Sequence, residues 1–142
     1  MRKITIVSLF VMFAAAFAAY PQCATPFPKP VLNFSGTTEG APGYLNQWFF
    51  VGNAAQYDNS LFAASPELPA CGLNKNASRT WVEIYTDTGA YIYGYCALTQ
   101  NAQLKKLSFP WKKTTPLPKG FFIRMRDRKC NRVVQSNTHL GF

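Results

Sequence analysis

The stretch from Cys71 to Cys96, CGLNKNASRTWVEIYTDTGAYIYGYC, decides the fold because it predicts a β-hairpin. Two runs rich in aromatic and β-branched residues, 79–85 and 90–98, flank the sequence Thr-Asp-Thr-Gly at 86–89. A glycine suits the turn position that needs a positive φ, since it has no Cβ to clash there. We therefore expect two antiparallel strands joined by a tight turn.

The rest of the chain repeats this pattern of short strands separated by turn residues. No segment has sustained helical periodicity, and glycine, asparagine and proline interrupt the apolar runs at short intervals. The pattern predicts an all-β chain that forms a single antiparallel β-sandwich of about seven strands. Besides the hairpin, we expect strands at 31–34, 44–51, 104–111, 120–126 and 132–140.

The first 18 residues have the plan of a secretory signal peptide. Residues 1–3 are positively charged at Arg2 and Lys3, residues 4–19 are nearly all apolar, and Ala-Phe-Ala at 16–18 is a cleavage signal. The alternative is a membrane anchor, but a span needs about 20 apolar residues and this run ends at a proline. We expect cleavage of 1–18, a proline-rich extended lead-in at 19–30, and a sandwich domain at 31–142. The mature protein is then secreted or periplasmic and does not span a membrane.

The chain has four cysteines, at positions 23, 71, 96 and 130. An even number in an exported chain favours disulfides over metal binding or catalysis. No C-x-x-C motif is present and His139 is the only histidine, so no metal site and no cofactor are predicted. Four cysteines allow three pairings, and the residues alone do not choose among them.

Positive charge is concentrated in one part of the chain. The formal net charge is +9, and ten lysines and arginines lie between Lys105 and Arg132 with Asp127 as the single acid among them. Such a surface attracts anions such as acidic glycans, lipopolysaccharide phosphates or nucleic acid. The alternative is that the charge only keeps a secreted domain soluble. Nucleic acid is the weakest candidate, because no nucleic-acid-binding motif is recognisable.

One connection is much longer than the others. Residues 53–78 separate two predicted strands, and loops of this length are either functional or folded onto the body of the domain. Leu61, Phe62 and the sequence Pro-Glu-Leu-Pro at 66–69 could pack as a flap. A binding role for the loop stays open beside this packing role.

The strand order and the two hairpins resemble a fibronectin type III or immunoglobulin-like sandwich. Four stretches, 71–82, 93–98, 127–128 and 136–137, further resemble short secreted bacterial proteins described only as fibronectin type III-like, with no assigned activity. The resemblance covers roughly residues 44–140, and Cys130 and the basic tail depart from it. It implies the sandwich fold and export, and it adds no catalytic residue.

The resemblance also implies a disulfide pairing. In such a sandwich the start of the chain, the long loop, the end of the second hairpin strand and the last turn lie at one pole. Cys71 then pairs with Cys96, and Cys23 pairs with Cys130. The first bond would also anchor the end of the long loop to the sheet.

Alternation along the hairpin predicts two different faces. If Tyr85 pairs with Tyr91 and Trp81 with Tyr95, then Val82 and Ile84 share the inner face with Ile92, Gly94 and Cys96. The opposite face carries aromatic rings and one acid, and the strand at 120–126 extends it with Phe122 and two arginines. The candidate ligand-binding residues on this face are Trp81, Glu83, Tyr85, Tyr91, Tyr93, Tyr95, Arg124 and Arg126.

Two interpretations of this face compete. In the first, cross-strand aromatic pairs merely stabilise the sheet, Glu83 pairs with Arg124, and the long loop covers part of the surface. In the second, exposed rings form a platform for the face of a sugar or for a partner protein, and the charged groups set its orientation.

The sequence provides little for catalysis. Of its six acids, Asp87 and Asp127 belong to turns and only Glu83 lies on a strand, whereas a glycosidase needs two carboxylates at close range. We therefore predict a non-catalytic, secreted binding module for an anionic or carbohydrate ligand, such as an anionic surface polymer. The alternative is a structural or accessory cell-envelope protein that binds an envelope or extracellular protein.

Overall fold

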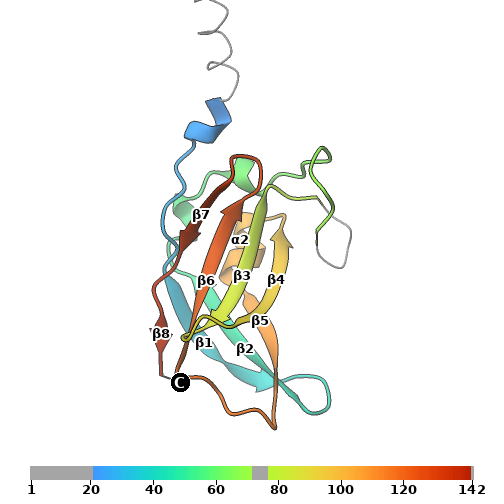
Figure 1. Ribbon diagram of the computed structural model, residues 1–142, viewed down its shortest axis with the longest axis vertical. Helices are drawn as coiled ribbons and strands as arrows, with labels where there is room; N and C mark the ends of the chain where they lie inside the picture. Colours follow the sequence, from blue (N-terminus) through green and yellow to red (C-terminus); the bar gives the residue numbers. More distant parts are fainter. Residues whose placement is uncertain (1–20, 72–76, 142) are drawn as a thin grey trace, which may run out of the picture.

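A computed structural model of the chain describes residues 21–71 and 77–141 (Figure 1). The predicted signal peptide, residues 1–18, lies outside the described residues. Among the described residues, no helix has the length and apolar character that crossing a bilayer requires.

Two antiparallel sheets form the molecule and confirm the predicted β-sandwich (Figure 1). The first sheet has the order β1-β2-β5 and the second the order β4-β3-β6-β7, with β8 also paired to β6. The strands are β1 (Leu32–Glu39), β2 (Tyr44–Val51), β3 (Thr80–Thr86), β4 (Tyr91–Ala97), β5 (Leu107–Lys112), β6 (Gly120–Asp127), β7 (Arg132–Gln135) and β8 (His139–Leu140). The helical elements are η1 (Pro21–Ala24), η2 (Ala54–Gln56), η3 (Asn59–Phe62) and α2 (Gln100–Lys105).

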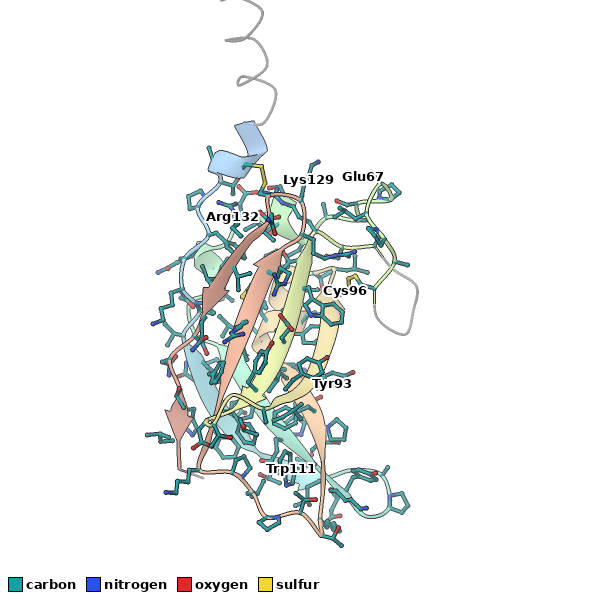
Figure 2. The ribbon with its side chains drawn as sticks, in the orientation of Figure 1. Glu67, Tyr93, Cys96, Trp111, Lys129 and Arg132 are labelled. Carbon is teal, nitrogen blue, oxygen red and sulfur yellow. A yellow bond between two sulfur atoms is a disulfide. The ribbon has the colours of Figure 1, made fainter. Side chains whose placement is uncertain are left out.

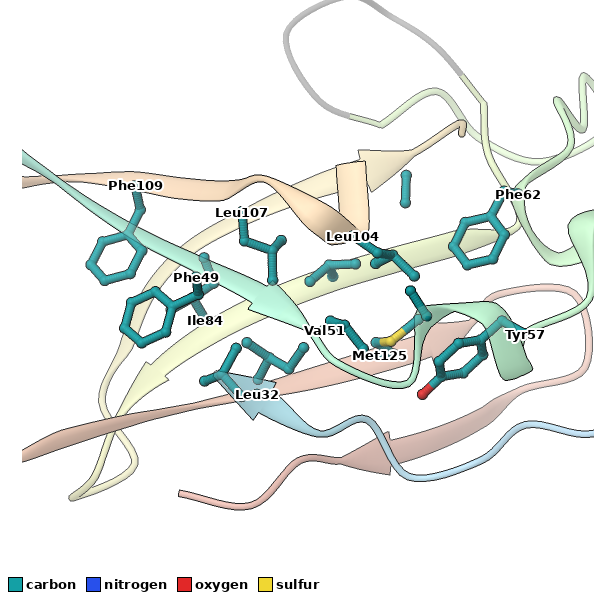
Figure 3. Close-up of a cluster of buried hydrophobic side chains, with 14 of the residues drawn as sticks. Leu32, Phe49, Val51, Tyr57, Phe62, Ile84, Leu104, Leu107, Phe109 and Met125 are labelled. Carbon is teal, nitrogen blue, oxygen red and sulfur yellow. The ribbon is translucent and has the colours of Figure 1, made fainter. Parts of the chain in front are cut away.

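The core lies between the sheets and is rich in aromatic rings (Figure 3). Phe121 of β6 contacts Phe49 of β2 and Phe109 of β5, with ring centroids 5.4 and 5.0 Å apart. Along β3 every second residue is buried, as expected for a strand with one face on the core. Aromatic pairs of this kind contribute roughly 0.5–1.5 kcal/mol each beyond the burial of their area, so these contacts fix one sheet against the other.

The predicted hairpin is confirmed, with a tight turn at residues 86–89. The backbone N–H of Gly89 donates to the carbonyl of Thr86, and Gly89 has a φ of 89°. Only a residue without a Cβ adopts this φ at low cost, so the turn chemistry inferred from the sequence holds.

Three strand boundaries differ from the expected ones. β1 does not end at residue 34 but continues to Glu39 through a bulge between Phe34 and Gly36. The segment from Gln100 to Lys105 is helical, so β5 begins only at Leu107. Leu104 in this helix is fully buried, and the segment QNAQLK is rich in residues with good helix propensity, so the strand expected from residue 104 begins three residues later. The last predicted strand is divided into β7 and β8.

The first part of the long loop, residues 54–62, packs on the body of the domain, whereas residues 63–70 are mostly exposed. Ala54, Tyr57, Leu61 and Phe62 are all buried in the main core. The Tyr57 hydroxyl also donates to the carbonyl of Pro28, which ties the lead-in to the loop. The packing interpretation is therefore confirmed for Leu61 and Phe62. The sequence Pro-Glu-Leu-Pro at 66–69 is exposed apart from half-buried Leu68, so the predicted flap does not pack there.

Both predicted disulfides are confirmed, and they lie at one end of the sandwich. The Cα atoms are 5.5 Å apart in Cys23–Cys130 and 5.7 Å apart in Cys71–Cys96. Figure 2 shows Cys96, Lys129, Arg132 and Glu67 near this end and Trp111 towards the other.

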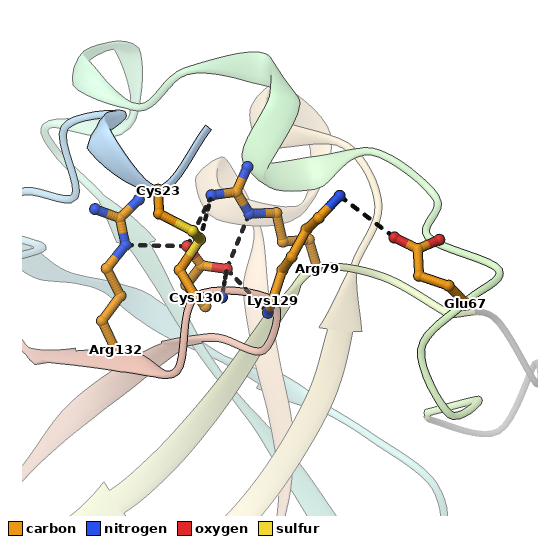
Figure 4. Close-up of a disulfide and its surroundings, with 7 residues drawn as sticks. Cys23, Glu67, Arg79, Lys129, Cys130 and Arg132 are labelled. Atoms are coloured by element: carbon orange, nitrogen blue, oxygen red, sulfur yellow. Dashed lines mark hydrogen bonds and ion pairs between the residues drawn. A yellow bond between two sulfur atoms is a disulfide. The ribbon is translucent and has the colours of Figure 1, made fainter. Parts of the chain in front are cut away.

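Asp127 holds this end together through two arginines (Figure 4). It accepts hydrogen bonds from Arg79 at 2.9 Å and from Arg132 at 3.0 Å, and it also accepts the backbone N–H groups of Lys129 and Cys130. Burial alone would raise the pKa of Asp127, but these hydrogen bonds outweigh it and hold the pKa below its usual value. The turn role expected of this acid is correct, and the ion pairs add a structural role that spacing did not indicate.

Candidate binding site

The outer face of the second sheet carries most of the predicted ligand-binding residues. In the observed register, Trp81 lies opposite Arg126, Glu83 opposite Arg124, and Tyr85 opposite Tyr91. Residues directly opposite one another point to the same side of a sheet. The structure therefore brings together six of the eight predicted residues: Trp81, Glu83, Tyr85, Tyr91, Arg124 and Arg126.

The placement of Tyr93 and Tyr95 on this face was wrong. A bulge between Ile84 and Tyr85 puts Tyr93 opposite Ile84 and Tyr95 opposite Val82, so both tyrosines point inward and pack against the core. Ile92 is the extra residue in β4, and one extra residue moves every later side chain to the other face.

Gly94 and Cys96 consequently lie on the outer face, opposite Glu83 and Trp81. Because Gly94 has no side chain, its position leaves room for two rings on this face. A Cβ built on Gly94 would collide with the Trp81 indole and would lie 2.7 Å from the Tyr91 hydroxyl oxygen. Both side chains thus rest on the β4 backbone, where only a glycine leaves room.

We call this arrangement of Trp81, Gly94 and Tyr91 the aromatic shelf. Trp81 is partly exposed and Tyr91 is 55% exposed. A glycine inside a strand often marks a bulge or a close approach, and this was the sequence signal that could have identified the shelf.

Tyr85 is not part of an open platform, because neighbouring groups cover it. Its ring stacks on Phe122 with centroids 5.2 Å apart and planes at 10°. The Arg124 guanidinium lies 4.8 Å from the Tyr85 ring centroid and is held by a hydrogen bond from its Nε to Gln135. Tyr85 and Arg124 therefore form a packed border beside the shelf.

Glu83 lies on this face beside the shelf and is held from both sides. The Tyr85 hydroxyl donates to its Oε2 at 2.9 Å, and Arg126 Nη2 lies 3.5 Å from its Oε1. Burial, and then the hydrogen bond to Glu83, raise the pKa of Tyr85. The expected pairing of Glu83 with Arg124 was wrong, because Arg124 stacks on Tyr85 instead. The outer face thus carries two arginines, Arg124 and Arg126, and one acid, Glu83, so its net charge is positive.

The two inward tyrosines line a separate hollow at the edge of the sandwich. It has a volume of about 250 Å³ and lies among β4, α2 and the start of β5. Gln103, Lys106 and Ser108 contribute to its wall. None of these three was predicted as a site residue, because the helix that brings them together was not predicted.

The acids of the described residues have structural roles. Glu39 pairs with Lys113 and Glu67 with Lys129, and Asp58 accepts the backbone N–H of Ser60 at the start of η3. Within residues 21–71 and 77–141, no group of three or more histidine, cysteine or acidic side chains could hold a metal ion. The described site offers aromatic rings, arginines and one carboxylate for contact with a ligand.

Comparison of the chain with protein-family models, curated proteins and solved structures gives no match. The resemblance to fibronectin type III-like secreted proteins therefore remains a prediction.

Proposed function

We propose that the protein is an exported, non-catalytic binding module that holds an acidic carbohydrate on the aromatic shelf. The observation that carries the proposal is a pair of rings, half-buried Trp81 and 55% exposed Tyr91, that lie against the backbone of β4 at Gly94. Two disulfides support a place in an oxidising compartment, where extracellular polymers are the available ligands.

The shelf suits the flat, C–H-rich face of a sugar ring. Rings fixed on a backbone floor lose little freedom when a ligand binds, so more of the contact energy is kept as affinity. Tyrosine and tryptophan add polar tips to a large apolar area. An open shelf without a deep pocket favours an internal unit of a polymer over a small molecule that must be enclosed.

The charge around the shelf favours an acidic ligand. Arg126 is 42% exposed in its side chain and lies beside the shelf, so its free donors can reach a carboxylate or sulfate. Without the predicted signal peptide, which contains Arg2 and Lys3, the chain has 13 basic residues against 6 acids, a formal net charge of +7, which raises the local concentration of polyanions. Binding should therefore weaken as salt is added.

The test is a titration of the protein with an acidic polysaccharide and with a neutral one of the same backbone. We expect saturable binding of the acidic polymer, and a loss of about tenfold or more in Trp81→Ala and Tyr91→Ala, by analogy with ring stacking at about 1–3 kcal/mol per ring. Tyr44→Ala is the matched control, because Tyr44 is a 39% exposed tyrosine on β2 of the other sheet. Equal affinity of all three variants would refute the proposal.

A second candidate function, binding of an envelope protein, is favoured by the edge strand β4. Its sequence, YIYGYCA, contains no charged residue and no proline, whereas the edge strand β5 carries Pro110 and Lys112. Edges of this unprotected kind accept a further strand from a partner. A photo-crosslinker at exposed Ala90, compared with one at exposed Ala41, would yield one specific adduct if this function is correct and none if it is not.

A further inference from the structure

The hollow beside β4 has walls that are fixed in place. The Tyr95 hydroxyl donates to the Gln103 carbonyl at 3.2 Å. The Gln103 side-chain oxygen accepts the backbone N–H groups of Leu98 and Thr99. These bonds join α2 to β4, so the tyrosine wall and the helix wall keep their separation without a ligand.

The wall of the hollow offers hydrogen-bond donors from Gln103 and Lys106. Burial, and to a lesser degree the neighbouring Tyr93, raise the pKa of the Tyr95 hydroxyl, so that it stays protonated at physiological pH. The Gln103 side chain uses its oxygen on the backbone and thereby leaves its NH2 group as the available function. The Tyr95 hydroxyl already donates its single hydrogen to the Gln103 carbonyl, so the donors open to a ligand are the Gln103 NH2 group and the Lys106 ammonium.

Lys106 gives the hollow a positive charge that no acid neutralises. No acidic residue lines the hollow, and the ion pairs of the described residues join other bases to Glu39, Glu67, Glu83 and Asp127. Lys106 is exposed at the end of α2, where its long stem can lie along the wall while its ammonium reaches the mouth.

We propose that this hollow is a binding site for a small organic carboxylate with a ring-sized body. The ring packs against Tyr93 and Tyr95, and the carboxylate pairs with the Lys106 ammonium. A cavity of about 150 Å³ already accommodates benzene, so 250 Å³ accepts one six-membered ring and its acid group. Aromatic acids and single uronic acids share this chemistry.

This site is distinct from the aromatic shelf, because Tyr93 and Tyr95 point to the inner side of β4 while Trp81 and Gly94 lie on the outer side. The two sites can therefore be tested independently, and the failure of one leaves the other standing.

The test uses two probes, benzoate and glucuronate, in NMR titrations of the labelled protein. We expect the amide signals of Ala102 and Ser108 to shift with a saturable dependence on one of the two probes, and the uncharged analogues benzyl alcohol and glucose to bind at least about tenfold more weakly. The probe that binds identifies the source of the carboxylate.

Two lysine variants provide the matched control. Lys106→Gln should lower the affinity of the bound probe about tenfold, whereas Lys105→Gln, one residue earlier and outside the lining, should leave it unchanged. Trp81→Ala should also leave it unchanged. Both lysines are exposed, so neither variant should alter the melting temperature. The proposal is overturned if neither probe shifts these signals at millimolar concentration, or if both lysine variants weaken binding equally.

Discussion

Replacing Asp127 with asparagine should destabilise the protein more than any other single change of charge. The carboxylate has no exposed surface, and Arg79, one of its two arginine partners, is only 3% exposed. Asparagine keeps the shape and one acceptor oxygen but removes the charge. Arg132 is 27% exposed and can turn towards water, whereas Arg79 would remain buried without the carboxylate that accepts two of its hydrogen bonds.

The magnitude follows from that difference. Breaking a buried ion pair by removing one partner costs about 3–5 kcal/mol of the free energy of unfolding. The exposed pair of Glu39 and Lys113 provides the control, because an ion pair in water contributes about 0–1 kcal/mol. Asp127→Asn should therefore lose several times more stability than Glu39→Gln.

The assay is urea unfolding followed by tryptophan fluorescence at pH 7 with the disulfides intact. The double variant Arg79→Met/Asp127→Asn should be more stable than Asp127→Asn, since it no longer buries an arginine that has lost its carboxylate partner. The argument from the buried pair is refuted if Asp127→Asn lowers the free energy of unfolding by less than about 1 kcal/mol. It is also refuted if the double variant is less stable than Asp127→Asn.

The pH dependence offers a second check on the same carboxylate. Its pKa is lower in the folded state than in the unfolded state, so the unfolded state takes up protons first as the pH falls. The contribution of Asp127 is fully present above about pH 4 and is lost as the pH falls through the folded pKa. Asp127→Asn should remove this part of the acid unfolding profile.

Three further results are expected. Gly94→Val should abolish binding of acidic polysaccharide, because the new side chain displaces the Trp81 and Tyr91 rings. Calorimetry measures this binding, and an unchanged affinity would contradict the proposal that the aromatic shelf holds the polysaccharide. A disulfide that closes a longer loop restricts the unfolded chain more, so the bond with the larger sequence separation should stabilise more. Removing Cys23–Cys130, with a separation of 107, should cost about 5 kcal/mol of the free energy of unfolding, against about 3 kcal/mol for Cys71–Cys96 with a separation of 25. Denaturant unfolding measures both, and the reverse order would contradict this argument. Burial raises the pKa of Tyr95 in the folded state, so stability should fall as the pH rises above about 10, and Tyr95→Phe, measured by thermal melts, should show a smaller fall.

The fold was predictable because its signals are local. The hairpin around residues 86–89 was recognisable from the turn glycine and the alternating strands, and the sandwich topology then brought the cysteines into the observed pairs. The helix α2 was missed because its six residues are too few to show helical periodicity, although glutamine, alanine, leucine and lysine favour a helix and Leu104 is buried.

The binding face was only partly predictable because register depends on a single residue. Strict alternation along β4 assigned Tyr93 and Tyr95 to the outer face, and the bulge at Ile92 reverses that assignment. The strand residues before the bulge and those on β3 and β6 were placed correctly. The role of Gly94 depends on the same bulge, so the shelf emerged only from the three-dimensional register.

The aromatic shelf is tested most directly by the indole N–H signals of the three tryptophans during a titration with acidic oligosaccharide. Trp48 and Trp111 lie on the other sheet and donate to Thr38 and to the Thr115 carbonyl, so they serve as internal references. We predict that the Trp81 indole and the Gly94 amide shift together and saturate, while the Trp48 and Trp111 signals stay in place. Saturable shifts at Trp48 or Trp111 with Trp81 unmoved would contradict the proposed binding surface.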